Sequence, residues 1–347
     1  MIETLLQYTN GFRYLWMLAF IMISAGLAKE FNLFAPAYAY VKNTFRSNKF
    51  VVVILSAIGG ILPIEGRVTV SAGLLDTVAP KDGPGREKLG IVDYLATHHY
   101  YLWSPMEKTI VLPIAAFGLT YLAWVTMLAP LIIVTALFIT GYIWWAVKDE
   151  EVAITPGNFK MSAVLRNVLP MFVAIFAYAA LGGEHIFAVF GSLTLYYIII
   201  TQQWDIKKLL SYVKWETVIV LAIVCVVGNI FRAHSSEIQQ LVKDHAVDPA
   251  SAPGMAVISL TLFAVTTMLG SSSKGTALAV LLAQAFGTEY FLWFFTVEYA
   301  AYLLSPVHKC VLIGNRYFGT PLATYYGTIA AWTGLMLLVV GIQTFVF

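Results

Sequence analysis

Four short polar segments place charged and hydroxyl side chains inside otherwise apolar stretches. Two of them are the loops Pro63–Thr69 and Gly270–Thr276, which mix glycine, hydroxyl and charged residues. The other two are Ser104–Lys108 and Ser305–Lys309, each a Ser-Pro pair followed by one apolar residue, an ionisable residue and a lysine. Ionisable groups in an apolar span are costly, so they are functional candidates by default.

The chemistry of these segments suits the recognition of a small anion. Hydroxyl groups are adaptable donors and acceptors, and glycine lets the backbone approach a ligand closely. A helix that begins directly after such a loop points its positive dipole end at the loop, which favours an anion. Basic residues also outnumber acidic ones across the four segments. The candidate substrate ligands are Glu65, Arg67, Thr69, Ser71, Lys108, Ser271, Ser272, Ser273, Lys274, Thr276 and Lys309.

The two Ser-Pro segments also predict where a coupling ion would bind. Proline inside a helix frees a backbone carbonyl, and freed carbonyls at helix breaks commonly ligate Na⁺ in transporters. Histidine titrates near neutral pH, so His308 could carry a proton instead. We assign coupling-ion or proton roles to Ser104, Glu107, Ser305 and His308, and the sequence leaves the choice between Na⁺ and H⁺ open.

The charged candidates also have structural explanations. Lys108 and Lys309 could extend along a helix to the membrane interface, with Glu107 as a charge partner. Glu65 and Arg67 could form one ion pair within their loop. The sequence leaves these alternatives open.

The remaining polar residues have similar alternatives. The serines after Gly270 could cap a helix without binding a ligand. His98 and His99 lie among aromatic residues, and we interpret them as packing residues. Cys225 and Cys310 are far apart in apolar stretches and give neither a disulfide framework nor a metal pattern. We therefore expect no metal site, no cofactor and no catalytic residue.

The elements that must hold these segments are membrane-spanning helices. Of the 347 residues, 59% are hydrophobic and 12% are charged, whereas a soluble domain carries about a quarter charged residues. The apolar residues form blocks of roughly 20, the length that crosses a hydrocarbon core. The first block, Phe12–Leu27, lacks the flanks of a signal peptide, so we interpret it as a retained span. The sequence predicts a multi-pass protein of the plasma (inner) membrane, with the lipid bilayer as a partner and no nucleic acid.

An internal repeat organises the chain. Tyr101–Gly118 and Tyr302–Gly319 share seven of eighteen residues at a constant offset of 201. Ile61–Ala79 aligns with Met268–Phe286 at an offset of 207. Because similar blocks follow in the same order, we infer a duplicated sequence.

The repeat predicts an all-α fold with two halves of opposite orientation. Each half contains a short hydrophobic hairpin with a polar tip and a later span broken at a Ser-Pro pair. Non-helical backbone at that depth survives only where it is buried or lines a wet cavity, so the hairpins are interpreted as re-entrant. Each half then crosses three times, and a two-span connector inverts the second half, as in many secondary transporters. We expect about 8 full spans plus 2 hairpins, divided into a first repeat at 1–147 (hairpin about 50–79, broken helix about 91–118), a connector at 148–204, and a second repeat at 205–347 (hairpin about 255–286, broken helix about 288–318).

Basic residues set the expected orientation. Thirteen of them fall on one side of this topology, against Arg13, Arg232 and Lys243 on the other. Cytoplasmic loops carry the excess of lysine and arginine, so both termini are predicted outside. The thirteen are Lys29, Lys42, Arg46, Lys49, Lys81, Arg86, Lys88, Lys148, Lys160, Arg166, Lys207, Lys208 and Lys214.

These motifs resemble those of the ion transporter superfamily, which includes divalent-anion/sodium symporters and arsenite permease-like proteins. More narrowly, ILPIEGRVTVSAGLLDTVA and LLSPVHKCVLIGNRYFG resemble the two motifs of the DUF401 family, an LLP-x-PGG-x-x-x-SAP-like hairpin and a late SP-x-H-LC-like segment. The resemblance implies inverted repeats, an elevator-like movement, and a binding region at Pro63–Ser71 and Ser305–Cys310. Because elevator-type relatives are often dimers, it also implies a homodimer.

The chain departs from these patterns at three places. Glu65-Gly66-Arg67 stands where a Pro-Gly-Gly-like turn is expected, and Lys309 stands where the family tends to carry an apolar residue. The Ser-Asn-Thr signature of the divalent-anion symporters is absent from both tips. Na⁺ coupling and a dicarboxylate substrate therefore do not follow from the resemblance.

The sequence favours an ion-coupled secondary transporter of a small anionic solute, working by alternating access. The alternative is a flippase-like carrier of a lipid-linked anion such as polyprenyl phosphate, which would need a lateral opening to lipid. An intramembrane metalloenzyme built on His98, His99 and His308 is disfavoured because no HExxH-like spacing is present. We therefore expect that the protein is not an enzyme.

Overall fold

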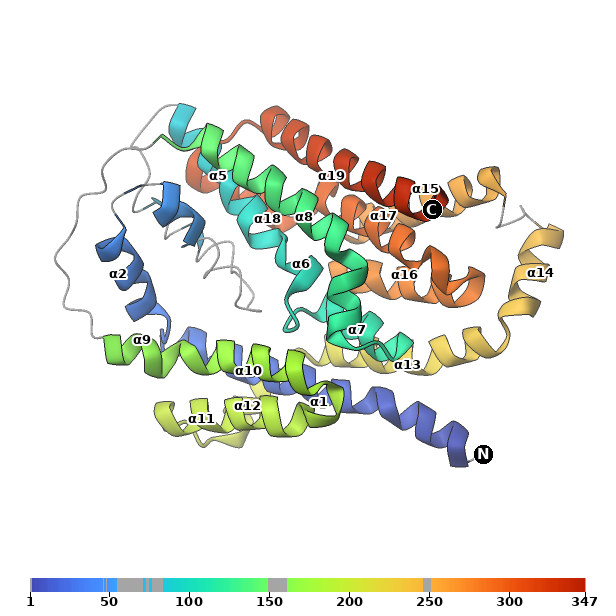
Figure 1. Cartoon of the computed structure of the whole chain (residues 1–347), viewed down its shortest axis with the longest axis horizontal. Coiled ribbons are helices and arrows are strands. Elements are labelled where there is room, and N and C mark those ends of the chain that lie inside the picture. The colour runs from blue at the N-terminus through green and yellow to red at the C-terminus, as the bar shows by residue number, and fades with distance from the viewer. Residues whose placement is uncertain are drawn as a thin grey trace.

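The computed structural model describes most of the chain. Its described residues are 2–45, 47, 49–54, 71–72, 75–76, 84–148, 161–245 and 251–346. These ranges form helices and short connections, with no β-strand among them (Figure 1). Most of the hairpin predicted at about 50–79 lies outside the described residues, and so do its candidate ligands Glu65, Arg67 and Thr69.

Five helical segments are long and apolar enough to cross a membrane. They are α1 (Ile2–Glu30), α8 (Tyr121–Ala146), the pair α9 and α10 (Met161–Asn167 and Leu169–Leu181), α15 (Ala252–Leu269) and α19 (Leu322–Phe345). A sixth candidate begins with α13 (Trp215–Ala233), which bends by 78° into α14 (Ser235–His245). The chain is therefore a multi-pass membrane protein, as the sequence predicts.

The second span of the predicted connector is shorter than expected. A π-helical turn, η2 (Phe187–Gly191, 5 residues), continues into α11 (Ser192–Thr201, 10 residues). Together they form a short apolar helix rather than a full span at 184–203. The helix ends because Gln202 adopts the left-handed conformation, with φ of 56°. A short helix, α12 (Ile206–Ser211), then leads into α13.

Helix α8 carries large apolar side chains on both its buried and its exposed faces. Trp124 and Leu128 are fully buried, whereas Leu122 and Leu137 are 68% and 69% exposed. A helix that presents large apolar side chains both to the protein core and outward is typical of a membrane span. The outward side chains therefore face the hydrocarbon of the lipid.

Both predicted helix breaks are present. In the first half, α5 (Pro84–His98) and the short α6 (Tyr100–Trp103) are followed by α7 (Lys108–Phe117). In the second half, α17 (Phe291–Leu304) is followed by α18 (Lys309–Phe318). Ser104 and Ser305 end the first segments with an extended backbone, because the proline that follows each disfavours helical geometry.

The helix ends recur at the offset that the sequence repeat has. Helices α7 and α18 begin and end 201 residues apart, at Lys108 and Lys309 and at Phe117 and Phe318. Each is closed by a glycine in the left-handed conformation, with φ of 67° at Gly118 and 68° at Gly319. Local backbone geometry is thus repeated together with the sequence.

Corresponding helices of the two halves run antiparallel where they meet. Helices α1 and α13 pack together, as do α8 and α19, and each pair runs in opposite directions in Figure 1. Between α8 and α19, the Thr135 hydroxyl contacts the Met336 sulfur at 3.6 Å, and these two residues are themselves 201 apart. The indole N–H of Trp332 also donates to Thr135, at 3.3 Å.

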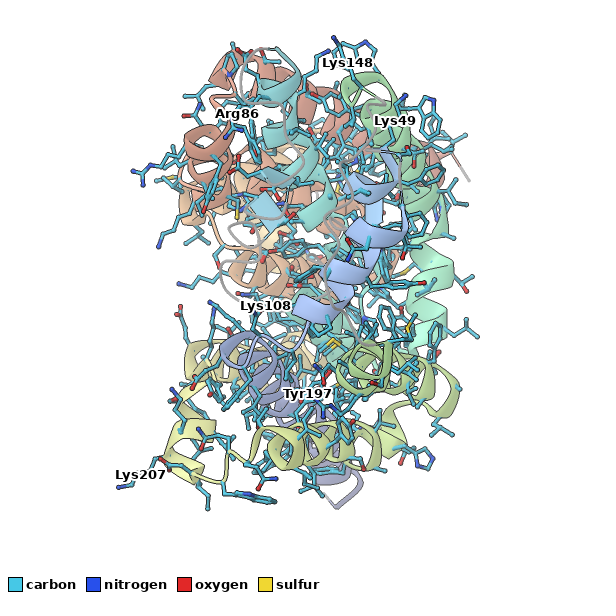
Figure 2. All side chains as sticks on the ribbon, turned by 90° about the vertical axis from the view of Figure 1, so that its left-hand side faces the viewer. Lys49, Arg86, Lys108, Lys148, Tyr197 and Lys207 are labelled. Carbon is cyan, nitrogen blue, oxygen red and sulfur yellow. The ribbon has the colours of Figure 1, made fainter. Side chains whose placement is uncertain are left out.

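One end of the molecule is rich in basic residues. Figure 2 faces this end, with Lys49, Arg86 and Lys148 in its upper part and Lys207 below. The Lys49 ammonium lies 4.7 Å from the ring centre of Trp144. Such lysine and tryptophan pairs are typical of a membrane interface. The N-terminus and α14 lie toward the opposite end (Figure 1).

Candidate functional site

A cavity of about 770 Å³ lies between the two helix breaks. Met106, Glu107 and Lys108 contribute from the first break, and Lys309 and Cys310 from the second. The start of α16 (Ser272–Phe286) and the second half of α1 also line it. The structure thus brings three of the four predicted polar segments to one cavity.

The charged lining of this cavity is mostly basic. It contains Lys29, Lys108, Lys214 and Lys309, and Glu107 is the one acidic side chain among the described lining residues. An anion is the occupant whose charge complements this basic lining.

Three helices begin at this cavity. The first residues of α7, α16 and α18 are Lys108, Ser272 and Lys309, and all three line it. None of their N-cap side chains accepts a hydrogen bond from the first amides of its helix. Amide N–H groups in a first turn have no partner within their helix and carry the positive end of the dipole. The same three helix ends therefore add to the positive potential of the lysines.

The predicted ligands on the second loop divide between different environments. Ser271 and Ser272 line the 770 Å³ cavity, and Ser273 lines an adjoining cavity of about 460 Å³ together with Lys108. Lys274 instead places its ammonium 2.9 Å from the Glu216 carboxylate, in an exposed ion pair. Lys274 lines neither cavity, so it is a poorer candidate ligand than the sequence indicates.

Of the predicted coupling residues at the breaks, Glu107 lines the cavity, whereas the other three make contacts outside it. Glu107 lines the cavity and is 5% exposed. The Ser305 hydroxyl donates to the Thr267 carbonyl at 2.6 Å, which joins the second break to the end of α15. Ser104 is buried, and its carbonyl accepts from the Glu107 amide at 2.9 Å. His308 contacts Tyr94 and His98 of α5.

A buried glutamate that the sequence analysis missed lies directly behind the second loop. Glu298 on α17 is 1% exposed, and its Oε1 is 2.7 Å from the Thr276 hydroxyl. That hydroxyl also donates to the Ser272 carbonyl at 2.9 Å. The hydroxyl has one proton, which it shares between these two acceptors while Glu298 is ionised. When Glu298 is protonated, its carboxyl group can donate to the hydroxyl, and each bond then has its own proton.

A second buried carboxyl group occupies a similar place in the first half. Asp93 on α5 is fully buried and faces Ser71, 22 residues earlier, but neither side chain completes a hydrogen bond with the described residues. Thr276 and Glu298 are also 22 residues apart. Each half therefore pairs a hydroxyl residue after its polar loop with a carboxyl residue on the next long helix.

Both carboxyl groups leave a signal in the sequence. Asp93 stands in the apolar run Gly90–Ala96, and Glu298 in the aromatic run Phe291–Leu304. Each was detectable as an ionisable residue inside a span. The repeat alignment identifies the Ser-Pro breaks because they recur at its offset. It does not align Asp93 with Glu298, so the repeat gives no signal for these two acids.

Gly275 makes room for the Glu298 carboxyl group. A Cβ atom at Gly275 would lie 2.5 Å from Glu298 Oε2 and 2.8 Å from Thr266 Cγ2. We expect Gly275→Ala to destabilise the protein by about 1–3 kcal/mol, because the extra methyl group overpacks the contact between α16 and α17. Thermal unfolding in detergent would measure this, with Gly327→Ala as a control, since a Cβ atom there meets nothing within 4 Å. An unchanged unfolding temperature for Gly275→Ala would contradict the packing.

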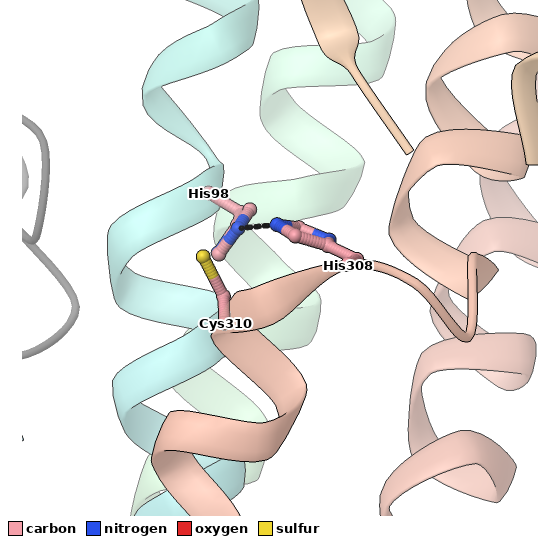
Figure 3. Close-up of side chains that lie close together, drawn as sticks. All are labelled: His98, His308 and Cys310. Atoms are coloured by element: carbon pink, nitrogen blue, oxygen red, sulfur yellow. Dashed lines mark hydrogen bonds between the residues drawn. The ribbon is translucent and has the colours of Figure 1, made fainter. Parts of the chain in front are cut away.

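A hydrogen-bonded cluster of aromatic and imidazole rings lies beside the second break. His98 Nε2 is 3.3 Å from His308 Nε2 (Figure 3). The Tyr94 hydroxyl is 3.0 Å from His308 Nδ1. Tyr101 and Tyr302 meet through their hydroxyl groups at 3.1 Å and also line the cavity. The two tyrosines are 201 residues apart, so the cavity wall contains a contact between equivalent positions of the repeat.

A comparison with models of protein families identifies the family of this chain. One family model, described as "Protein of unknown function (DUF401)", matches residues 4–347. The chain belongs to the DUF401 family. The family match covers both helix breaks and both buried carboxyl residues, and it confirms the narrower of the two resemblances that the motifs indicate. No curated protein matches the chain.

Two of the cavity lysines in this DUF401 chain are not among the ligands that the sequence predicts. Lys29 and Lys214 count among the basic residues of the cytoplasmic side in the predicted topology. They reach the cavity because α1 ends and α13 begins next to it, with the two helices packed together. The sequence holds no signal for this, since the two lysines are 185 residues apart and their approach is tertiary.

Proposed function

We propose that this DUF401 protein is an ion-coupled secondary transporter of a small anionic solute, working by alternating access. The observation that carries the proposal is the convergence of four lysines and three helix N-termini on one cavity between two broken helices. Positive helix ends at discontinuous helices commonly hold the anionic group of a transported substrate. Glu107 would then balance part of the basic charge while the cavity is empty.

The proposed mechanism uses two halves of inverted topology. It is supported by the antiparallel packing of equivalent helices and by the helix ends that recur 201 residues apart. In this scheme α15 and α16 form a re-entrant hairpin with its tip at Gly270-Ser271, and an elevator-like movement carries the cavity from one side to the other. The fold would then belong to the ion transporter superfamily, as the sequence motifs suggest.

The proposed coupling ion is H⁺, carried by Glu298. A protonated Glu298 can donate to the Thr276 hydroxyl while that hydroxyl donates to the Ser272 carbonyl, so each bond has its own proton. A buried carboxylate without a charge partner is costly, so release of the proton would require water or a cation to reach the group. Thr276 lies on the first turns of α16, which also begins at the anion cavity, and this joins the proton site to the substrate site.

The proposed orientation follows from the basic end of the molecule. An excess of lysine and arginine marks the cytoplasmic side, so the end shown in Figure 2 would be cytoplasmic, with both termini outside in the plasma (inner) membrane. By analogy with elevator-type transporters, the working unit would be a homodimer.

A ligand panel tests the proposed function. We expect one class of small anion to raise the unfolding temperature of the purified protein, since selective binding stabilises the native state by mass action. The panel should contain carboxylates, phosphonates and inorganic oxyanions, each with and without Na⁺ and at several pH values. Stabilisation by a short-chain polyprenyl phosphate alone would favour the lipid-linked carrier. No response to any anion would contradict both.

A further inference from the structure

Three metal-binding atoms meet beside the second helix break. His98, His308 and Cys310 each offer one ligand atom, and these three atoms all lie within 4.8 Å of one another (Figure 3). His98 and His308 are 0% and 3% exposed, whereas Cys310 also lines the cavity. The cluster is therefore buried but reaches a possible entry path at its sulfur atom.

The hydrogen bonds of the two rings fix the position of one proton on each. His98 Nδ1 is 2.7 Å from the Tyr94 carbonyl, which can only accept, so Nδ1 carries the hydrogen. The Tyr94 hydroxyl donates to the Leu303 carbonyl at 2.8 Å. Since its proton is used there, the 3.0 Å contact between Tyr94 and His308 requires His308 Nδ1 to donate.

Both Nε2 atoms of the neutral rings then present a lone pair, and they face one another at 3.3 Å. Two lone pairs at this distance repel each other unless a proton or a metal ion lies between them, and a proton would make one ring an imidazolium. A tetrahedral Zn²⁺ with Zn–N bonds of 2.0–2.1 Å places its two nitrogens about 3.3 Å apart. Metal-bound histidines also typically donate their other ring N–H to a carbonyl or another oxygen acceptor, as both rings do here.

We propose that His98, His308 and Cys310 bind a transition metal ion of the Zn²⁺ type. Imidazole and thiolate ligands favour such ions over Mg²⁺ or Ca²⁺. Binding forms two metal–nitrogen bonds and one metal–sulfur bond, and the thiol proton of Cys310 is released to solvent. The site was missed in the sequence because its two histidines are 210 residues apart. This proposal does not depend on transport.

Titration of the metal-free, full-length protein with Co²⁺ tests the site. We expect one equivalent of Co²⁺ to produce d–d bands of a tetrahedral complex and a thiolate-to-cobalt charge-transfer band, with Zn²⁺ displacing the Co²⁺. The chain has two cysteines, so Cys310→Ser should remove the charge-transfer band and Cys225→Ser should keep it. His308→Ala should weaken Co²⁺ binding by about 100-fold or more, whereas His99→Ala should leave it unchanged.

The same titration can overturn the proposal. If folded wild-type protein, judged by size-exclusion profile, shows no charge-transfer band, the two histidines share a proton rather than a metal ion. A band that survives in Cys310→Ser would place the thiolate ligand elsewhere. Should Cys310→Ser fail to fold, Cys310→Ala and metal content by mass spectrometry give the same discrimination.

Discussion

Replacing Lys108 with alanine should weaken the binding of the transported anion by about 10- to 100-fold. The half-buried Lys108 begins α7 and lines both cavities. A hydrogen bond to a charged group contributes about 1.5–3 kcal/mol, which corresponds to that range in Kd. Adding Lys309→Ala should remove anion-dependent stabilisation altogether, because two of the four cavity lysines are then absent. Isothermal titration or the concentration dependence of thermal unfolding would measure both effects.

Lys207→Ala is the matched control for this prediction. Lys207 is exposed on α12, at the end of the molecule shown in Figure 2, and does not line the cavity. The Lys207→Ala substitution therefore removes one positive charge, as Lys108→Ala does, but leaves the cavity lining unchanged. If Lys207→Ala weakens anion binding as much as Lys108→Ala does, long-range charge and not local contact accounts for the affinity, and the cavity is not the anion site.

Glu298→Gln should abolish proton-driven uptake while leaving anion exchange intact. Glutamine has nearly the same shape, and its amide can replace the hydrogen bond with the Thr276 hydroxyl. It cannot gain or lose a proton, so the variant is fixed in the equivalent of the protonated state. In proteoliposomes with an imposed pH gradient, we expect concentrative uptake to fall to the level of protein-free vesicles. Counterflow of labelled against unlabelled anion should continue.

Glu289→Gln provides the comparison for Glu298→Gln. Glu289 lies only nine residues earlier and is exposed, so the same change of chemistry occurs outside the buried site. It should retain full uptake. Gradient-driven uptake by Glu298→Gln would remove this residue from the coupling mechanism and would turn attention to Asp93, the buried carboxyl group of the first half.

The parts of the fold that follow from local chemistry could be predicted from the sequence. The apolar blocks predict spans, and the Ser-Pro pairs predict the ends of α6 and α17, because the residue before proline avoids helical geometry. The connector helix that ends at Thr201 was predicted too long, since hydrophobicity alone gave no sign of the left-handed Gln202. Element type was thus easier to predict than element length.

The candidate site was predictable only where the repeat marked it. Lys108 and Lys309 stand at equivalent positions after the same break, and both line one cavity. Glu298 and the pairing of His98 with His308 depend on contacts between α16, α17, α5 and the second break, which no local pattern encodes. Lys274 was predicted as a ligand because it lies in a polar loop. In the structure it forms an exposed ion pair with Glu216, which the local sequence does not indicate.

The contact between Tyr101 and Tyr302 has an evolutionary consequence. Under the proposed inversion, a two-fold axis in the membrane plane would pass close to these hydroxyl groups, which are equivalent positions of the two halves. Residues next to such an axis meet their own equivalents, so one half could make the same contact with a second, inverted copy of itself. An ancestor of half this length could therefore have assembled as an antiparallel pair of identical subunits, inserted in both orientations. Fusion into one chain would have freed each copy to diverge. For example, the second half has His308 at the position where the first half has Glu107.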